Sequence, residues 1–215
     1  MPNDRAIMHI MAQVQNLASQ YDRVAGGWGD KMRTLGYSDA YLGFLASGPR
    51  ARAVDHVCDV GCGTGAFAEA WMGIYGAAAN VTLMDPSELM LDRAAAALMR
   101  RGGDVATVQA GIEGFRPTGP FDHLLMAHVI EHVPDPTAAL RQLRGWVTPG
   151  ARLWLVVSKP HWCNAIIWLQ WRHRAFQEVE VTAVLQDTGW RLEDTYAFPS
   201  GPPSRTSRGY LATAI

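Results

Sequence analysis

The chain has 215 residues, of which 48% are hydrophobic and 18% are charged, with a formal net charge of -1. This length and balance predict a folded domain and exclude a disordered chain, and a net charge near zero gives no general attraction to nucleic acid or anionic membranes. Three cysteines, Cys58, Cys62 and Cys163, form no disulfide framework, so we expect a reduced, cytoplasmic setting.

The first fifty residues predict two helices. Apolar residues spaced by three and four define one helix over 3–18, and a second covers Asp39–Ala46, with Ser38 as its N-cap and Gly48 and Pro49 as its stop. The start of the chain lacks the uninterrupted apolar core of a signal peptide. No run of about 18 apolar residues occurs, so we expect no membrane span.

From residue 53 onward, apolar runs alternate with helical patterns. Strands are predicted over 53–60, 81–85, 105–110, 121–129 and 151–158, and helices over 66–73, 88–101 and 136–147. Ser87 is positioned to cap the helix that starts at Glu88. Strands alternating with helices predict right-handed βαβ units and a parallel sheet, and nearly continuous apolar strands predict helices on both of its faces.

After Ser158 this alternation breaks. Residues 159–177 form an insertion rich in Trp and His, followed by a predicted helix over 179–189 and two strands, 190–198 and 209–215. The intervening PSGPPSRTSR is short, and we expect it to be a helix-free loop. Two strands joined in this way pair antiparallel.

The stretch VCDVGCGTGAF (57–67) carries three glycines directly after a predicted strand. Glycines permit a sharp turn and a close approach of a ligand to the backbone. The spacing G-x-G-x-G differs from the dinucleotide pattern G-x-G-x-x-G, although Ala66 is tolerated at the last position, so spacing alone leaves NAD open. Asp59 disfavours a pyrophosphate and favours a cation such as a sulfonium. Asp85 either binds ribose hydroxyls or caps the next helix.

Four stretches resemble successive motifs of class I S-adenosylmethionine-dependent methyltransferases: VCDVGCGTGAF, LMDPSELM, FDHLLMAHVIEHVPDP and TPGARLWLVVS. The resemblance covers residues 54–158 and extends more loosely to the closing helix and strands. It implies an α/β, Rossmann-like, doubly wound seven-stranded sheet, mostly parallel with an antiparallel last strand. The whole chain, 1–215, is then a single methyltransferase domain with an N-terminal helical cap over 1–50 and a substrate-lid insertion over 159–177.

The resemblance also implies S-adenosyl-L-methionine as the cofactor. It assigns cofactor contacts to Tyr21, Asp59, Gly61, Cys62, Gly63, Asp85, Pro86, Met90, Gly111, Ile112, Glu113, Ala127 and His128. Asp59 would lie beside the methionine part, Asp85 would hold the ribose, and Tyr21 would cover the cofactor. Gly111 stands where members often have an acid that meets the adenine, so backbone groups or Glu113 must take that role.

The stretch HVIEH (128–132) matches the zinc-peptidase pattern H-x-x-E-H in its letters. That pattern works on a helix, whereas here the first histidine ends a strand and Pro134 follows closely, and no third ligand is evident. We therefore expect no metal. His128 is the candidate catalytic residue, as a general base near the transferred methyl. The alternative is a histidine that hydrogen-bonds the local loop.

Candidate substrate contacts lie late in the chain. The Trp-rich insertion predicts either an apolar lid over a flat acceptor or a helix that packs on the sheet or on another subunit. Within or beside it, His161 and Trp162 are candidates for substrate binding. Arg205 either meets an anionic group of the acceptor or solvates a loop.

The leading hypothesis is an enzyme that moves a methyl group from S-adenosylmethionine to an O, N or S nucleophile of a small-molecule acceptor. Three alternatives stay open: a methyltransferase of a membrane lipid or quinone, reached by peripheral contact of the Trp-rich insertion; an NAD(P)-dependent oxidoreductase; and a non-catalytic cofactor-binding module. No basic stripe with interleaved aromatics occurs, so we expect no nucleic-acid partner. The oligomeric state is left open.

Overall fold

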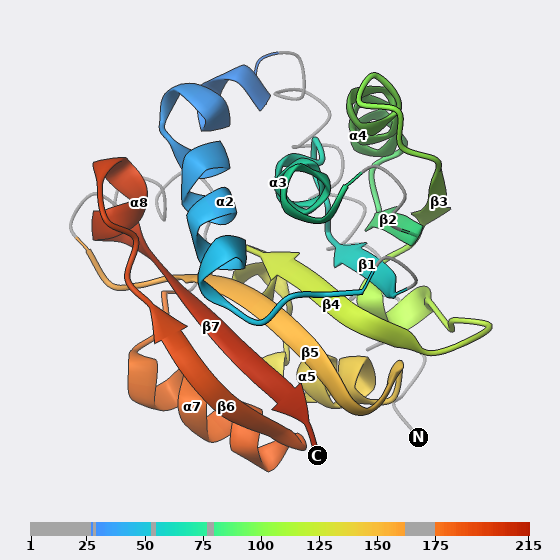
Figure 1. Ribbon diagram of the computed structural model, residues 1–215. Coiled ribbons are helices and arrows are strands. Elements are labelled where there is room, and N and C mark those ends of the chain that lie inside the picture. The colour runs from blue at the N-terminus through green and yellow to red at the C-terminus, as the bar shows by residue number, and fades with distance from the viewer. Residues whose placement is uncertain (1–26, 28, 53–54, 77–79, 162–174) are drawn as a thin grey trace.

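The computed structural model describes residues 27, 29–52, 55–76, 80–161 and 175–215. They build one seven-stranded sheet in the order β3-β2-β1-β4-β5-β7-β6 (Figure 1). The strands are β1 (His56–Val60), β2 (Asn80–Asp85), β3 (Val105–Gln109), β4 (Phe121–Ala127), β5 (Val147–Ser158), β6 (Trp190–Tyr196) and β7 (Ser207–Ala214). Neighbours from β3 to β5 pair parallel, and β7 runs antiparallel to both β5 and β6. The predicted fold class is confirmed.

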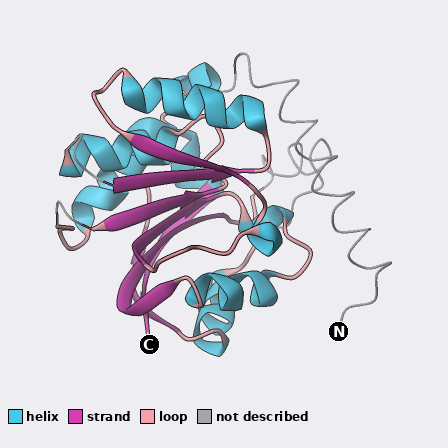
Figure 2. Ribbon diagram, turned by 90° about the vertical axis from the view of Figure 1, so that its right-hand side faces the viewer, coloured by secondary structure: helices cyan, strands magenta, loops and turns pink. Residues whose placement is uncertain are grey.

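Helices cover both faces of this sheet. They are α2 (Tyr37–Ser47), α3 (Ala66–Tyr75), α4 (Glu88–Met99), α5 (Pro136–Arg144), α7 (Glu178–Asp187) and the short α8 (Gly201–Thr206), with 3-10 turns η1 (Ile112–Gly114) and η2 (Ile130–His132). Helices α2, α3 and α4 lie on one face, and α5 and α7 lie on the other (Figures 1 and 2). The sheet is therefore the middle layer of three, as in doubly wound folds.

Two hydrophobic clusters fill the space between the layers. Successive residues of a strand point to opposite faces, and β1 follows this rule: Val57 belongs to the cluster beneath α2, α3 and α4, whereas Cys58 belongs to the cluster beneath α5 and α7. Trp71, Trp154 and Trp190 are among the largest fully buried side chains. This packing fixes the strands, and thereby the edge at which the parallel strands end.

Two local predictions were wrong. Helix α2 begins at Tyr37, so Ser38 lies inside it, and the N-cap is Gly36 in a left-handed conformation at φ 85°. The join between β6 and β7 contains α8 where we expected a helix-free loop. Prolines at the first positions of α8 suit a helix start because their φ is already helical, and the Thr206 hydroxyl donates to the Pro202 carbonyl at 2.9 Å.

The remaining boundaries agree with the sequence pattern to within a few residues. Ser87 caps α4 as predicted, accepting a hydrogen bond from the Met90 amide at 3.1 Å. Strand β5 begins earlier than predicted, at Val147. The predicted helix over 3–18 lies outside the described residues, as does most of the Trp-rich insertion.

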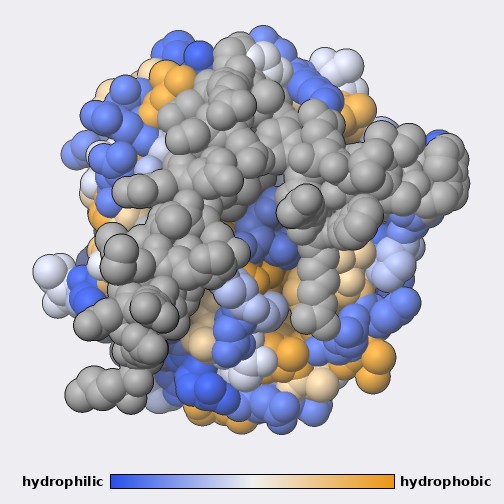
Figure 3. Space-filling model, turned by 180° about the vertical axis from the view of Figure 1, so that it is seen from behind, coloured by the Kyte–Doolittle hydropathy of each residue, from blue (hydrophilic) through white to orange (hydrophobic). Residues whose placement is uncertain are grey.

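Among the described helices, none is both long and apolar enough to cross a membrane. On the face drawn in Figure 3, hydrophobic residues gather toward the lower half with hydrophilic residues interspersed.

Candidate functional site

The glycine loop after β1 combines close packing with open space. Gly61, Gly63 and Gly65 all have positive φ, between 52° and 86°, which side chains rarely tolerate. A Cβ on Gly61 would lie 2.5 Å from Val129 Cγ2, and one on Gly65 would lie 3.0 Å from the Ala94 Cβ. Among the residues that the structure describes, a Cβ on Gly63 would meet nothing within 4 Å. Two glycines therefore serve packing, and the third leaves room beside the backbone.

Asp85 ties this loop to the end of β2. One carboxylate oxygen accepts from the Gly63 amide at 2.9 Å, and the other accepts from the Ser87 amide at 2.9 Å. The cap of α4 is Ser87 itself, so capping does not explain Asp85. Its carboxylate holds the two loops at a fixed distance at the carboxyl edge of the sheet.

Asp59 lies deeper, beneath the loop. Its side chain accepts a hydrogen bond from the Ala68 amide at 3.1 Å, in the first turn of α3, and the residue is 1% exposed. Burial raises the pKa of Asp59 to about 7, although the Ala68 hydrogen bond works in the other direction, and the nearby Asp85 adds to the rise.

The other predicted cofactor residues gather at the carboxyl ends of β1 to β4, with differing exposure. Cys62, Met90 and Ile112 are buried. Gly61, Gly63, Pro86, Gly111, Ala127 and His128 are partly exposed, and Glu113 is exposed. The Cys62 amide donates to the Met84 carbonyl at 2.9 Å, which joins the loop to β2. Tyr21 lies outside the described residues.

His128 follows β4 in a strained conformation. At φ 56°, it is the one non-glycine residue with positive φ in the part of the chain that the structure describes. Its Nδ1 lies 3.1 Å from Glu131 Oε1 and 3.0 Å from Ser158 Oγ. Its Nε2 lies 3.4 Å from Ser207 Oγ. The ring is held from both sides by polar groups of three other elements.

Glu131 is a buried carboxylate whose side chain is 1% exposed. Oε1 lies 3.1 Å from His128 Nδ1 and accepts a hydrogen bond from the Ser158 amide at 2.6 Å. Oε2 has no hydrogen-bond partner among the described residues. Burial pushes the pKa of Glu131 upward, but the His128 hydrogen bond and charge, with the Ser158 amide and His132, hold this pKa below its ordinary value. The carboxylate is therefore ionised at neutral pH.

A hydroxyl cluster closes the other side of the imidazole. The Tyr37 hydroxyl lies 3.0 Å from Thr206 Oγ1 and 3.3 Å from Ser207 Oγ. The Tyr37 ring meets the His128 ring edge-on, with centroids 5.5 Å apart. Sequence reasoning missed this cluster and Glu131: the H-x-x-E spacing was a usable signal for Glu131, whereas Tyr37 and Ser207 are 170 positions apart.

The zinc-peptidase likeness has no helical basis. His128 follows a strand, and η2 is a three-residue 3-10 turn rather than an α-helix that would align positions four apart. Within the described ranges, no group of three or more His, Cys, Asp or Glu side chains is placed to hold a metal ion.

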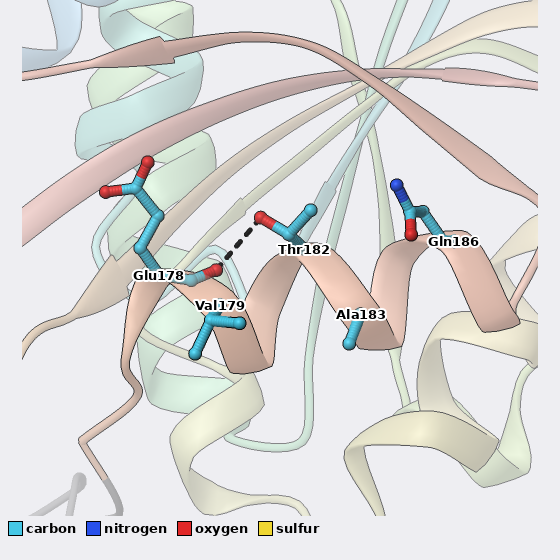
Figure 4. Close-up of a pocket in the computed structure, with 5 residues that line it drawn as sticks. All are labelled: Glu178, Val179, Thr182, Ala183 and Gln186. Atoms are coloured by element: carbon cyan, nitrogen blue, oxygen red, sulfur yellow. Dashed lines mark hydrogen bonds between the residues drawn. The ribbon is translucent and has the colours of Figure 1, made fainter.

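The candidate substrate residues are placed only in part. His161 is partly exposed beyond the end of β5, and Arg205 is exposed on α8. Trp162 lies outside the described residues. A shallow groove elsewhere is lined by Glu178, Val179, Thr182, Ala183 and Gln186, all from the one helix α7 (Figure 4). That groove has none of the side chains predicted for the site.

The fold and this edge define a class of protein. Open α/β sheets bind ligands beyond the carboxyl ends of their parallel strands, at the point where strand order reverses. Here that point lies between β1 and β4, flanked by the glycine loop and His128. The class is that of open α/β proteins which bind a ligand at this switch point.

Comparison with known proteins specifies the family. A family model described as a methyltransferase domain matches residues 32–193, and the chain belongs to this family. The predicted assignment, an S-adenosylmethionine-dependent methyltransferase, is confirmed. This family match also disfavours the NAD(P)-dependent oxidoreductase considered from the glycine spacing.

Individual relatives are more distant. The chain is similar to a ubiquinone biosynthesis O-methyltransferase of Xanthomonas axonopodis pv. citri, with 27% identity over 74% of this chain and 75% of the relative. The fold resembles that of Burkholderia thailandensis 1,6-didemethyltoxoflavin-N1-methyltransferase with bound S-adenosylhomocysteine, at a TM-score of 0.74 and 19% identity, over 96% and 90% of the two chains. It also resembles magnesium protoporphyrin IX methyltransferase from Synechocystis, at a TM-score of 0.66 and 18% identity, over 85% and 84% of the chains.

Proposed function

We propose that this protein binds S-adenosylmethionine between the glycine loop and Asp85, and transfers its methyl group to an O, N or S nucleophile of a small molecule beside His128. The observation that carries this proposal is the open space at Gly63 next to a carboxylate that the loop itself orients. The protein's main contribution is alignment and exclusion of water, because the sulfonium of the bound cofactor already supplies an activated methyl group.

The residues of this edge suit the cofactor. Asp85 has oxygens that accept hydrogen bonds, as ribose hydroxyls require, and the glycine loop brings backbone next to open space. Asp59 adds a titratable acid directly beneath the loop, where a positive charge above it would favour the ionised form. This combination favours a cationic, phosphate-free cofactor over a pyrophosphate.

Replacement of Asp85 tests the site. Asp85→Asn keeps the side chain's shape but replaces one acceptor oxygen with a donor, so we expect S-adenosylmethionine affinity to fall at least about tenfold in calorimetric titration. The matched control is Asp92→Asn, because Asp92 is an exposed acid on α4. The affinity of this variant for S-adenosylmethionine should equal that of the wild type. Wild-type affinity in the Asp85 variant would place the cofactor elsewhere.

A quinone or lipid acceptor is a second candidate, favoured by the name of the Xanthomonas relative. In this variant of the proposal, the Trp-rich insertion meets a membrane surface and receives an apolar acceptor there. Flotation with phosphatidylcholine and phosphatidylglycerol vesicles measures this directly. Co-flotation of the wild-type chain is the expected result, and recovery of all protein in the bottom fraction would refute the membrane-bound acceptor.

A further inference from the structure

We propose that Glu131 is a positioning residue that fixes His128 as a base with one accepting nitrogen, and that the acceptor is therefore a small molecule with an ionisable hydroxyl, such as a phenol or an enol. This inference rests on the proposed function and narrows it, because it names the chemical class of the acceptor. It is independent of how the cofactor is held.

The hydrogen bonds give the imidazole a direction. An ionised carboxylate only accepts hydrogen bonds, so the 3.1 Å contact requires a proton on His128 Nδ1. In the neutral ring the lone pair then lies on Nε2, which faces the hydroxyl of Ser207. The Ser158 amide donates to the same carboxylate oxygen and keeps it in place. The result is a series of hydrogen-bonded groups that runs from the buried Glu131 carboxylate, through the His128 imidazole, to the Ser207 hydroxyl.

The turn that carries Glu131 and His128 destabilises the folded chain in two ways. Glu131 is a carboxylate with a 1% exposed side chain, and its Oε2 has no partner in the described part of the chain. Burying a charged oxygen without a hydrogen-bond partner destabilises the folded chain. His128 is also strained, at φ 56°. Both destabilising features lie in one short turn at the predicted reaction site. If only a structural hydrogen bond were needed there, a neutral glutamine could accept it without burying a charge.

Among the described residues, the contacts of the ring are one negatively charged group and several neutral hydroxyls. Around the ring, α2 contributes Tyr37, β5 contributes Ser158, and β7 contributes Ser207. The charged group in contact with the ring is Glu131, and the pKa of Glu131 in turn responds to His132. Burial first, and then the nearby Tyr37, Asp59 and Glu131, raise the pKa of Tyr41, so Tyr41 stays neutral. A proton arriving at Nε2 is therefore stabilised by Glu131.

A base of this kind matters most for a hydroxyl acceptor. A phenol with a pKa near 10 is neutral at physiological pH and is a poor nucleophile until its proton leaves. In the proposed step the acceptor hydroxyl takes the place of Ser207 as the partner of His128 Nε2, and its proton moves to that nitrogen as the new O–CH3 bond forms. The bond between the methyl carbon and sulfur breaks, and its electron pair stays on sulfur as the neutral thioether. Glu131 keeps its charge and takes no proton.

The kinetic test compares two probe acceptors in two variants. The probes are catechol, which is neutral at the assay pH, and 4-nitrocatechol, whose acidic hydroxyl is already ionised. We expect Glu131→Gln to lower kcat/KM for catechol by about 10- to 100-fold and to change that for 4-nitrocatechol by less than about threefold. The control is Glu193→Gln on β6, remote from His128, which should match the wild type with both probes.

Equal losses with both phenols would overturn the positioning role. Turnover of neither phenol by a wild-type protein that binds S-adenosylmethionine would overturn the hydroxyl class and leave the proposed function standing. Absence of cofactor binding would instead defeat the proposed function itself, so the two failures are distinguishable.

A second readout needs no acceptor. In the wild-type chain with labelled histidine, 15N NMR of His128 should show the neutral ring protonated on Nδ1. In Glu131→Gln, loss of the negative charge should change the balance of tautomers. A neutral wild-type ring protonated on Nε2 would overturn the proposal, and thermal unfolding of the variant verifies that it is folded.

Discussion

At the scale of single residues, Asp59 links the stability of the chain to pH. Its carboxyl is buried beneath the glycine loop, and burial raises its pKa to about 7. An ordinary aspartate in an unfolded chain has a pKa of about 4. Between these two values the folded chain binds more protons than the unfolded chain, so the unfolding free energy falls as the pH rises through this window.

This gives a prediction for Asp59→Asn. Because asparagine does not titrate, the variant lacks this loss of stability, and without ligand it should become more stable relative to the wild type as the pH rises from about 5 to 8. Thermal unfolding of both proteins across that range measures the difference. A difference that stays constant with pH would show that the Asp59 pKa is not raised in the folded chain.

The sequence predicted part of the site residue by residue. The resemblance to methyltransferase motifs assigned Asp85 and Gly63 to the cofactor site, and both lie at the carboxyl edge of the sheet. The hydrogen bond from the Gly63 amide to the Asp85 carboxylate was not predicted. Glu131 was read only as part of a zinc-like pattern. Its role depends on a turn that brings it to His128, and Ser207 reaches the same ring from the far end of the chain, so no local pattern records either contact.

At the scale of elements, the glycine loop separates packing from ligand space. Gly63→Ala places a Cβ in open space at φ 52°, so the substitution costs only the left-handed strain of about 1 kcal/mol. If the cofactor takes that space, affinity for S-adenosylmethionine should fall at least about tenfold. The matched control is Gly102→Ala, because Gly102 has φ 80° and its Cβ would also lie in open space among the described residues. This variant should have similar backbone strain and an unchanged affinity for S-adenosylmethionine. Equal affinity in both variants would contradict this use of the space.

The starts of the helices were predicted from the sequence in some cases and missed in others. Ser87 was identified as a cap because a hydroxyl before a helical pattern has a specific role, and it takes that role. Ser38 carries the same signal, but Gly36 starts α2 two residues earlier. Helix α8 was missed because prolines and glycine mark loops in most contexts, although two prolines also suit a first helical turn.

At the scale of the whole molecule, the strand order assembles the site. Because β1 lies between β2 and β4, the glycine loop meets Asp85 on one side and the turn that carries His128 on the other. The antiparallel β7 starts at the same edge and contributes Ser207. Alternating strands and helices predicted this sheet, whereas side-chain contacts across its edge required the structure.

The most direct test is a crystal structure of the chain with S-adenosylhomocysteine bound. We predict that the ribose hydroxyls contact Asp85, that the amino-acid part lies beside Gly63, and that the sulfur faces His128. A ligand bound away from the carboxyl ends of β1 and β2, or that edge filled by the chain's own side chains, would contradict the account.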